Sequence, residues 1–373
     1  MSDRPKLLIV SISDISSDPR VRKQVELFRS DYDVSTCSLG PKMDGVDIHY
    51  EIPGDARGWV SDRQALITRR YERAYWGISA VASARGMLPR NSFDVVIAND
   101  LNTVPLALSL NPRRGVHADL HEFAPREKES ERTWRMFVAP YMRWLCRRYL
   151  PQTASATTVS QGIARQYEKD YGVHFEVVTN AAPYSRRTPT PVANPIRLIH
   201  AGAAQRFRRL ELCIDAMRDV DGATLDLMLM PNEPAYLAEL RQRAADIPSV
   251  QFRAPVPYAS LVETMAEYDA SLVVFPPSTF NLANTLPNKF FESVQARLAL
   301  VIGPTPEMVT ILDEYGLGLV TEDFGVGSLH QALARLDRGA VERWKRASDA
   351  AALPLSSERQ VEGWKTAIAR LVA

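Results

Sequence analysis

Residues 270–303 read ASLVVFPPSTFNLANTLPNKFFESVQARLALVIG, and this stretch gives the clearest indication of the fold class. It begins with the short apolar run ASLVVF and ends with a second one, LALVIG, and such runs are typical of buried strands. Pro287 has no N–H to offer a helix interior, so we place it in the first turn of a helix that continues through Phe290, Phe291 and Val294. A strand, a helix and a second strand predict a βαβ unit with parallel strands.

The same alternation of strand and helix recurs along the chain. Apolar runs of this kind occur at 6–12, 94–98, Gly115–Leu120 and 156–160, and again at 196–201, 224–230 and 250–252. Residues 180–195, NAAPYSRRTPTPVANP, are proline-rich and suit a linker. We therefore predict an α/β protein with two Rossmann-like doubly wound domains, at 1–185 and 186–355, and a final helix at 356–373 that crosses back to the first domain.

Length, charge and cysteine content describe an ordinary soluble protein. The 373 residues are enough for two cores. The formal net charge of +1 gives no general attraction to nucleic acid. The cysteines have no spacing typical of a disulfide framework or a zinc site, and no apolar run is long enough for a signal sequence or a membrane span. These features predict a cytoplasmic protein, free or at the inner face of the membrane.

The loops that follow the strands hold the candidate site residues, because open α/β sheets bind ligands beyond the carboxyl ends of their strands. The first loop holds Asp18 and Arg20 but no GxGxxG, which disfavours a dehydrogenase. His121 and Glu122 form an ionisable pair directly after an apolar strand, and Asn180 lies at the end of the first domain.

The loops of the second domain offer several groups that could bind an anion. Gly202 permits close approach of the backbone, and Arg208 follows shortly after it. Lys289 lies near a helix start, where N–H groups already carry about half a positive charge, so an anion is expected between them. We predict a diphosphate site with Arg208 and Lys289 as charges and Glu292 as an acceptor for ribose hydroxyls. Further groups of this site are expected from Arg206, Thr285, Leu286 and Asn288.

Four segments of the chain resemble the glycosyltransferases of family 4, which have the GT-B fold and move a sugar from a nucleotide-sugar to an acceptor with retention of anomeric configuration. The segments are ADLHEFAP at 118–125, TTVSQGIARQY at 157–167, VVTNAAP at 177–183 and LPNKFFESVQARLALVIG at 286–303. The last resembles the strongest signature of the family. The resemblance runs over most of the chain and implies two Rossmann-like domains facing a central cleft.

The resemblance also implies roles for individual residues. Glu292 would hold the ribose, and His121 would lie beside the reacting sugar, with Asn284 and Arg208 as further catalytic residues. The residues expected on the acceptor side are Asp18, Arg20, Glu122 and Asn180. The implied reaction is hexosyl transfer without a metal or other cofactor. It would take place from a UDP or GDP sugar to a hydroxyl of a glycan such as a polysaccharide, of a glycolipid or of a small molecule.

Two departures from the family pattern keep other functions open. Ala203 follows Gly202 where the family has an arginine, and Asn284 stands where it has a glutamate. Asparagine lacks the negative charge that could favour an oxocarbenium-like transition state. One alternative is a non-catalytic GT-B subunit that binds nucleotide. A second is a nucleotide-sugar epimerase, which needs carboxylate acid and base groups.

Each candidate also has a purely structural interpretation. Glu292 can form a solvated helix pair with Lys289. His121 can satisfy a strand end, Asp18 can cap the first helix, and Asn180 can belong to a hinge turn. At least one residue of the arginine cluster is expected on an ordinary exposed turn; the cluster consists of Arg206, Arg208 and Arg209.

Two basic, aromatic stretches at 67–90 and 133–150 have two interpretations. Their arginines and aromatic rings suit the headgroup level of an anionic membrane, which would fit a lipid-linked acceptor and peripheral contact through 133–150. They also suit core-packed helices with exposed arginines, which we favour. A last motif, Asp219 and Asp221, matches an Asp-x-Asp metal site of another transferase fold. Because Gly222 and a strand follow, we interpret it as a helix-to-strand turn.

Overall fold

The computed structural model describes residues 4–60 and 62–373, and these residues form two compact units. Unit 1 contains the described residues up to Thr179 together with Thr279–Asn281 and Val361–Ala373, and unit 2 contains Asn180–Ser278 and Leu282–Gln360. Each unit is built on one parallel sheet with helices on its faces. The prediction of two Rossmann-like α/β domains is confirmed.

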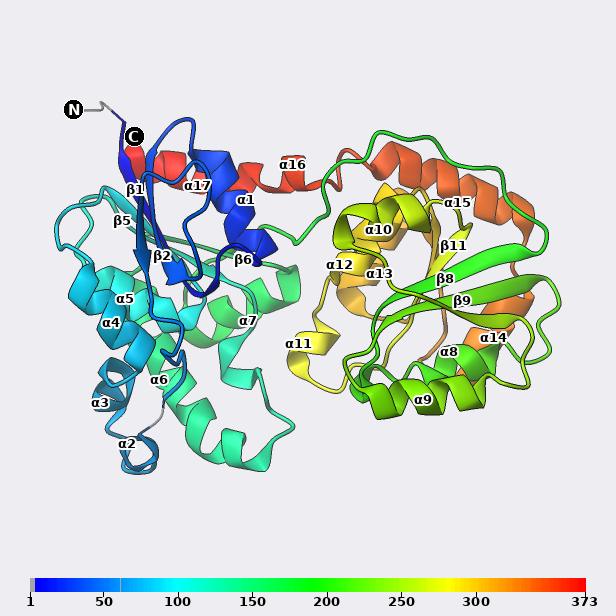
Figure 1. Ribbon diagram of the computed structural model, residues 1–373, viewed down its shortest axis with the longest axis horizontal. Helices are drawn as coiled ribbons and strands as arrows, with labels where there is room; N and C mark the ends of the chain where they lie inside the picture. Colours follow the sequence, from blue (N-terminus) through cyan, green and yellow to red (C-terminus); the bar gives the residue numbers. More distant parts are fainter. Residues whose placement is uncertain (1–3, 61) are drawn as a thin grey trace. The chain divides into compact units, whose positions relative to one another are not determined.

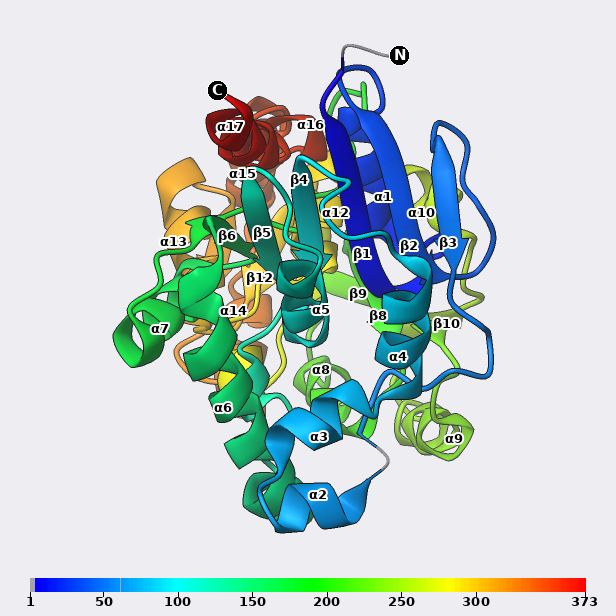
Figure 2. The same ribbon diagram turned by 90° about the vertical axis from the view of Figure 1, so that its left-hand side faces the viewer.

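The sheet of unit 1 has the strand order β3-β2-β1-β4-β5-β6-β7, with every pair parallel (Figure 2). Strands β2 and β3 are added on one side of β1 and strands β4 to β7 on the other, so the topological switch point lies between β1 and β4. The strands are β1 (Lys6–Asp14), β2 (Asp33–Leu39), β3 (Ile48–Glu51), β4 (Val95–Asn99), β5 (Gly115–Leu120), β6 (Ser155–Thr158) and β7 (Glu176–Val177).

Helices cover this sheet, and α17 from the end of the chain is one of them. Asp18 caps α1 by accepting hydrogen bonds from the N–H groups of Arg20 and Val21 at 3.0 and 3.2 Å. The helices are α1 (Pro19–Phe28), α2 (Arg63–Ile67), α3 (Tyr71–Trp76), α4 (Ser79–Met87), α5 (Val104–Ser109), α6 (Ala139–Tyr149), α7 (Gln161–Tyr171) and α17 (Glu362–Val372). The short turns are η1 (Leu101–Thr103), η2 (Ala124–Arg126), η3 (Trp134–Val138) and η4 (Leu150–Gln152).

Unit 2 repeats this topology, with the strand order β10-β9-β8-β11-β12-β13 and a switch point between β8 and β11. Helices α8, α9 and α14 cover one face of the sheet, and α10, α12, α13 and α15 the other (Figure 1). The strands are β8 (Ile196–Ala203), β9 (Ala223–Met230), β10 (Val250–Arg253), β11 (Ala270–Val273), β12 (Ala299–Ile302) and β13 (Gly318–Val320).

The remaining elements of the chain are short turns and helices that follow the strands of unit 2. They are η5 (Arg206–Arg208), α8 (Glu211–Ala216), α9 (Pro234–Arg243), α10 (Tyr258–Met265), α11 (Phe280–Ala283), α12 (Asn288–Gln295), α13 (Pro306–Tyr315), α14 (Val326–Ala334), α15 (Arg338–Ala351) and α16 (Ser357–Gln360). The sheet is packed on both faces, because central residues such as Leu198, Leu272 and Val301 are fully buried.

One local prediction needs correction. The helix of the opening stretch begins one residue later than predicted: Pro287 has extended backbone, with ψ 147°, and is the N-cap residue of α12. In the stretch 133–150, the apolar side chains of Trp134, Met142 and Leu145 lie in the core of unit 1, while its arginines are exposed. The core-packed interpretation is therefore the correct one for this stretch. Among the described residues, no helix combines the length and the apolar character needed to cross a membrane.

Candidate functional site

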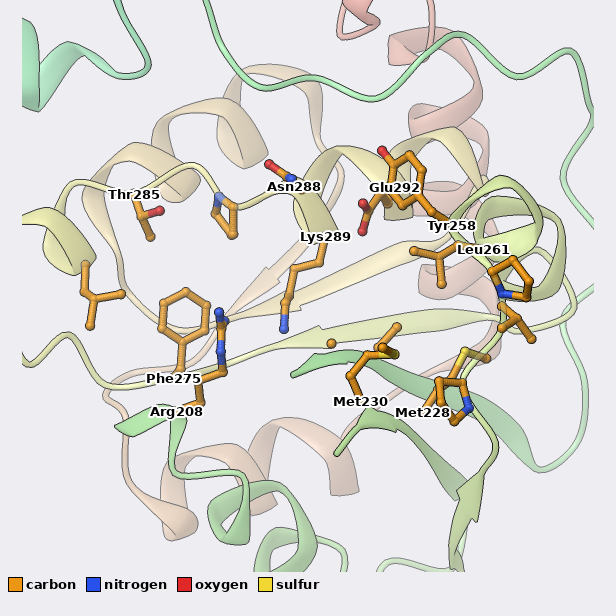
Figure 3. A pocket seen from close by; sticks show the side chains of 17 residues that line it. Arg208, Met228, Met230, Tyr258, Leu261, Phe275, Thr285, Asn288, Lys289 and Glu292 are labelled. Carbon is orange, nitrogen blue, oxygen red and sulfur yellow. The ribbon is translucent and has the colours of Figure 1, made fainter. Parts of the chain in front are cut away.

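A cavity of about 660 Å³ lies in unit 2 at the switch point between β8 and β11. Parallel sheets place their ligands at this point, because the loops after the two central strands leave in opposite directions. The cavity is lined by the end of β8, the turn η5, the end of β9, the start of α10 and the start of α12. Figure 3 shows that the side chains of Arg208 and Lys289 point into it, with Glu292 and Tyr258 beyond Lys289.

Lys289 is held by a buried histidine that lies two residues before Gly202 on β8. The Nδ1 atom of His200 is 2.8 Å from the carbonyl oxygen of Leu272, which can only accept a hydrogen bond. Nδ1 therefore carries the proton, and Nε2 accepts a hydrogen bond from Nζ of Lys289 at 3.2 Å. The side chain of Lys289 is only 8% exposed, so its position is fixed by the strand below it.

Burial at the end of the cavity that holds Arg208 and Lys289 makes the charged forms of its basic groups less favourable. Burial lowers the pKa of Lys289 to about 7, and the nearby charge of Arg208 adds to this effect while Glu292 opposes it. Burial and then the charge of Lys289 hold the pKa of His200 well below its usual range, so this ring is neutral. Burial also lowers the pKa of Arg208. Arg208 and Lys289 are therefore two buried cations at the start of α12. An anion bound between them would stabilise both charges, so the site favours an anion.

Gly202 leaves room for the ammonium group of Lys289. A Cβ atom at this position would lie 2.7 Å from Nζ of Lys289, which is closer than such contacts ever come. The backbone of Gly202 also has φ +153°, a region that other residues rarely adopt. The conformation therefore favours glycine, and a side chain at this position would displace Nζ of Lys289.

The opposite end of the cavity is acidic and apolar. Glu292 is 6% exposed and follows Lys289 by three residues on α12, so both side chains lie on one face of the helix. Tyr258 lies at the start of α10, and partial burial together with the charge of Glu292 raises its pKa. The wall beyond Glu292 is mostly apolar and contains Met228, Met230, Val256, Pro257 and Leu261.

The structure brings together most of the residues predicted for the second domain. The predicted residues that line the cavity are Gly202, Arg208, Thr285, Asn288, Lys289 and Glu292. Three others do not line it. Leu286 is 7% exposed and packs in the core of unit 2. Asn284 precedes the cavity residue Thr285 without lining the cavity itself.

Arg206 is the third exception, and its geometry is that of an exposed surface residue. Its guanidinium donates to a carboxylate oxygen of Glu239 at 2.6 Å and lies 4.8 Å from the ring centroid of Tyr236. Arg206 and Arg208 are the first and third residues of η5, a turn with three residues per revolution, so their side chains leave in different directions. Arg209 likewise lies outside the cavity and pairs with Glu211 at 3.3 Å.

In unit 1, Arg20 is buried rather than available to an acceptor. It is 3% exposed and binds both carboxylate oxygens of Asp119, at 2.7 and 2.6 Å, as well as the carbonyl oxygen of Val178 at 2.8 Å. Although burial opposes ionisation of Asp119, Arg20 lowers the pKa of this carboxyl to about 2. The carboxylate of Asp18 is engaged at the start of α1 and by the hydroxyl of Ser13 at 2.7 Å, as the capping interpretation predicts.

His121 and Glu122 lie at the carboxyl end of β5 beside a cavity of about 310 Å³. Nδ1 of His121 is 3.5 Å from Oδ1 of Asp100, while its buried Nε2 has no hydrogen-bond partner in the part of the chain that the structure describes. Burial raises the pKa of Glu122 to about 7, and the charges of Glu127 and Asp100 add to this rise. Asn180 is the first residue of unit 2 and is half-buried.

Sequence reasoning missed His200 and Tyr258. His200 could have been found, because side chains two apart on a strand point to the same side and Gly202 had been assigned to the site. The Asp219–Asp221 segment lies in the turn between α8 and β9, as predicted. Within residues 4–60 and 62–373, no group of three or more histidine, cysteine or acidic side chains could hold a metal ion.

Comparisons with known proteins agree with this geometry. Residues 26–186 match the family model Glycosyltransferase Family 4. No curated protein matches the chain. The solved structures that resemble it include sucrose-phosphate synthase (tll1590) from Thermosynechococcus elongatus, with a TM-score of 0.72 and 10% identity over 99% of both chains. Anabaena Alr3699/HepE in complex with UDP has a TM-score of 0.72 and 12% identity over 98% of this chain and 100% of its own.

A third structure, the E. coli trehalose-6-phosphate structure bound with UDP-2-fluoro glucose, has a TM-score of 0.67 and 10% identity over 98% of both chains. At these identities the structures show the fold alone. The described chain therefore has the two-domain GT-B fold of these structures.

Proposed function

We propose that the protein transfers a hexosyl group from a nucleoside diphosphate sugar to a hydroxyl acceptor with retention of configuration. The main support for the proposal is the cavity at the β8–β11 switch point. Arg208 and Lys289 point into one part of this cavity, and Glu292 lies beyond Lys289 (Figure 3). A nucleoside diphosphate has the matching order of groups, because its two phosphates are anionic and its ribose offers paired hydroxyls.

In this proposal the donor occupies the cavity of unit 2. Its diphosphate lies between Arg208 and Lys289, where the first N–H groups of α12 add hydrogen bonds. Its ribose hydroxyls donate to the carboxylate of Glu292, and its base lies against the apolar wall that includes Met228 and Val256. HepE and the E. coli structure contain UDP or a UDP sugar in the same fold, which supports UDP as the nucleotide.

Arg208 and Lys289 also serve the chemical step. The bond between the anomeric carbon and the diphosphate breaks while the acceptor oxygen bonds to the same face of the sugar, and the acceptor proton passes to the departing phosphate. Charge that develops on this phosphate is stabilised by the two cations, an effect worth several kcal/mol in a site that excludes water. His121 beside the reacting sugar and Asn284 near the donor remain predictions of the family resemblance, as do Glu122 and Asn180 on the acceptor side.

The first experiment measures the melting temperature of the protein with UDP, GDP, dTDP and CDP, each in large excess. A nucleotide at 100 times its dissociation constant stabilises the folded state by about 2.7 kcal/mol, so one diphosphate is expected to raise the melting temperature by several degrees. Transfer is then assayed with sugars on that nucleotide, and the anomeric configuration of the product is read by NMR. If none of the four shifts the melting temperature of folded protein, the assignment of the cavity is wrong. Binding without turnover would favour the non-catalytic subunit.

Gly202→Ala tests the close approach at the cationic end. The added methyl group pushes Nζ of Lys289 away, so we expect the affinity for the stabilising diphosphate to fall roughly tenfold, together with a loss of about 1 kcal/mol in unfolding free energy. Titration calorimetry and thermal melting measure the two effects. Gly222→Ala is the matched control, because Gly222 is exposed and a Cβ atom there meets nothing within 4 Å. Unchanged affinity in Gly202→Ala would show that Lys289 does not bind the diphosphate.

A further inference from the structure

Two cavities of unit 1 lie next to each other at the carboxyl ends of β4 and β5. The cavity beside His121 measures about 310 Å³, and its neighbour measures about 490 Å³. They share Asn102, Glu127 and Met142 in their walls, so the two cavities are direct neighbours. Their combined size is in the range of sites that bind small ligands, and the ends of parallel strands are where such ligands bind.

The smaller cavity, here called the polar chamber, is built to accept hydrogen bonds. Its wall contains the carboxylates of Asp100, Glu122 and Glu127 and the ring of His121. Asp100 has φ 64°, a strained conformation for a non-glycine residue, and such strain is typical of functional positions. Together with the buried Nε2 of His121, which has no hydrogen-bond partner in the described chain, these oxygens suit a ligand with several hydroxyl groups.

The larger cavity, here called the apolar chamber, has a different wall. It includes Trp59, Leu66, Ile78, Trp134 and Val138. Its polar lining residues include Lys128, the shared Asn102 and Glu127, and Tyr141. Tyr141 is 1% exposed, and its hydroxyl has no hydrogen-bond partner among the described residues. A buried hydroxyl without a partner is unfavourable, so an oxygen of a bound ligand at this point would be stabilising.

Large apolar side chains are exposed beside the apolar chamber. Trp59 lines the chamber and is 65% exposed. Ile67 of α2 follows the lining residue Leu66, and Met136 of η3 lies between the lining residues Trp134 and Val138. Ile67 is 59% exposed and Met136 is 54% exposed. Figure 2 shows α2, α3 and the beginning of the α6 segment together at this end of unit 1. An apolar ligand group that leaves the chamber would meet an apolar rim.

We propose that the two chambers form the acceptor site and that the acceptor is amphipathic, with a sugar head among Asp100, His121 and Glu122 and an apolar aglycone beside Trp59 and Trp134. The identification of the ligand as the acceptor rests on the proposed function. Binding of the ligand to the two chambers requires no donor. An ether or glycosidic oxygen between head and aglycone would accept the hydrogen bond of the Tyr141 hydroxyl.

The test compares n-octyl and methyl glycosides of glucose, galactose and mannose, all below the micelle concentration and without nucleotide. Binding is followed by tryptophan fluorescence and titration calorimetry. For the sugar that fits, we expect the octyl glycoside to bind at least ~10-fold more tightly than the methyl glycoside, because the added methylene groups leave water. Equal affinities would overturn the assignment of the apolar chamber.

Variants separate the two chambers. Trp59→Ala, at an exposed position that folding tolerates, is expected to remove most of the octyl preference and to leave methyl glycoside binding unchanged. Asp100→Asn together with Glu122→Gln is expected to weaken both glycosides, and the matched control is Glu26→Gln on the exposed face of α1. Octyl binding that survives the Asp100 and Glu122 changes would be mere surfactant adsorption and would refute the sugar site.

Tyr141→Phe gives a readout that a packing role would not produce. We expect the variant to be at least as stable as the wild type without ligand, since a buried hydroxyl without a described partner is removed, and yet to bind the octyl glycoside several-fold more weakly. Equal affinity would show that this hydroxyl does not contact the ligand. All of these variants should keep the UDP-dependent rise in melting temperature. If the wild type binds none of the glycosides, this inference is wrong, whereas the proposed function is wrong if none of the four diphosphates raises the melting temperature of the wild type.

Discussion

Lys289→Met is expected to weaken the binding of the stabilising nucleoside diphosphate roughly 10- to 100-fold, because it removes a charge-assisted hydrogen bond worth ~1.5–3 kcal/mol. The free protein should become no less stable, since methionine fills the space of the lysine without a buried charge that Arg208 and burial disfavour. Titration calorimetry with the diphosphate and with the bare nucleoside separates the phosphate contact from the base contact. Equal losses for both ligands would indicate a collapsed pocket.

The same lysine predicts a pH dependence of binding. Its folded-state pKa is about 7, below the unfolded value, so the unfolded chain binds more protons between pH 7 and the usual lysine range. The contribution of Lys289 to the unfolding free energy therefore rises with pH across this window. Diphosphate binding needs the charged lysine, so affinity should fall above pH 7, by up to tenfold per pH unit, while the nucleotide phosphates stay fully ionised.

The check is a series of calorimetric titrations from pH 7 to 9, repeated with Lys289→Met. The wild type should take up a proton on binding at the upper end of the range, which appears as a dependence of the binding enthalpy on buffer. Lys289→Met should show neither the proton uptake nor the slope. A slope that persists in the variant would assign the titration to another group.

Glu292→Ala is expected to have the second large effect, a loss of about 100-fold in affinity for the stabilising ribonucleotide. The carboxylate can accept hydrogen bonds from two ribose hydroxyls, and each charged hydrogen bond contributes ~1.5–3 kcal/mol, part of which solvation offsets. Glu292 is 6% exposed, so little water can replace it.

A comparison with 2′-deoxy and 3′-deoxy diphosphates makes this prediction specific. The wild type should bind the deoxy ligands much more weakly than the ribonucleotide, whereas Glu292→Ala should bind all of them alike. The loss of affinity on removing a ribose hydroxyl is compared between the wild type and Glu292→Ala. This comparison separates the contact between carboxylate and hydroxyl from any change in the fold. If the variant still discriminates against the deoxy ligands, another residue holds the ribose.

The architecture was predictable because its signals are local. Short apolar runs followed by helical patterns define βαβ units wherever they occur, and the helix at Lys289 and Glu292 carried its own signature. Gly202, Lys289 and Glu292 could be assigned to one cavity because the ends of neighbouring parallel strands meet at one edge of a sheet.

The errors concern partners that lie far away in the sequence or turns whose direction was not known. Arg20 looked available, but Asp119 lies 99 residues later and binds it in the core. Arg206 and Arg208 are separated only by their rotation around η5. His200 reads as one more residue of a buried strand, and only its contact with Lys289, 89 residues later, gives it a role.

The position of α17 in unit 1 has a consequence for biosynthesis. Trp364 is 1% exposed, lies 4.5 Å from the guanidinium carbon of Arg20 and donates to the hydroxyl of Thr157. The first unit emerges from the ribosome long before this tryptophan does, on the order of tens of seconds at ordinary rates of translation. During that interval the buried charge pair of Arg20 and Asp119 lacks its aromatic cover. Unit 1 of the nascent chain therefore completes its core only after α17 has been synthesised.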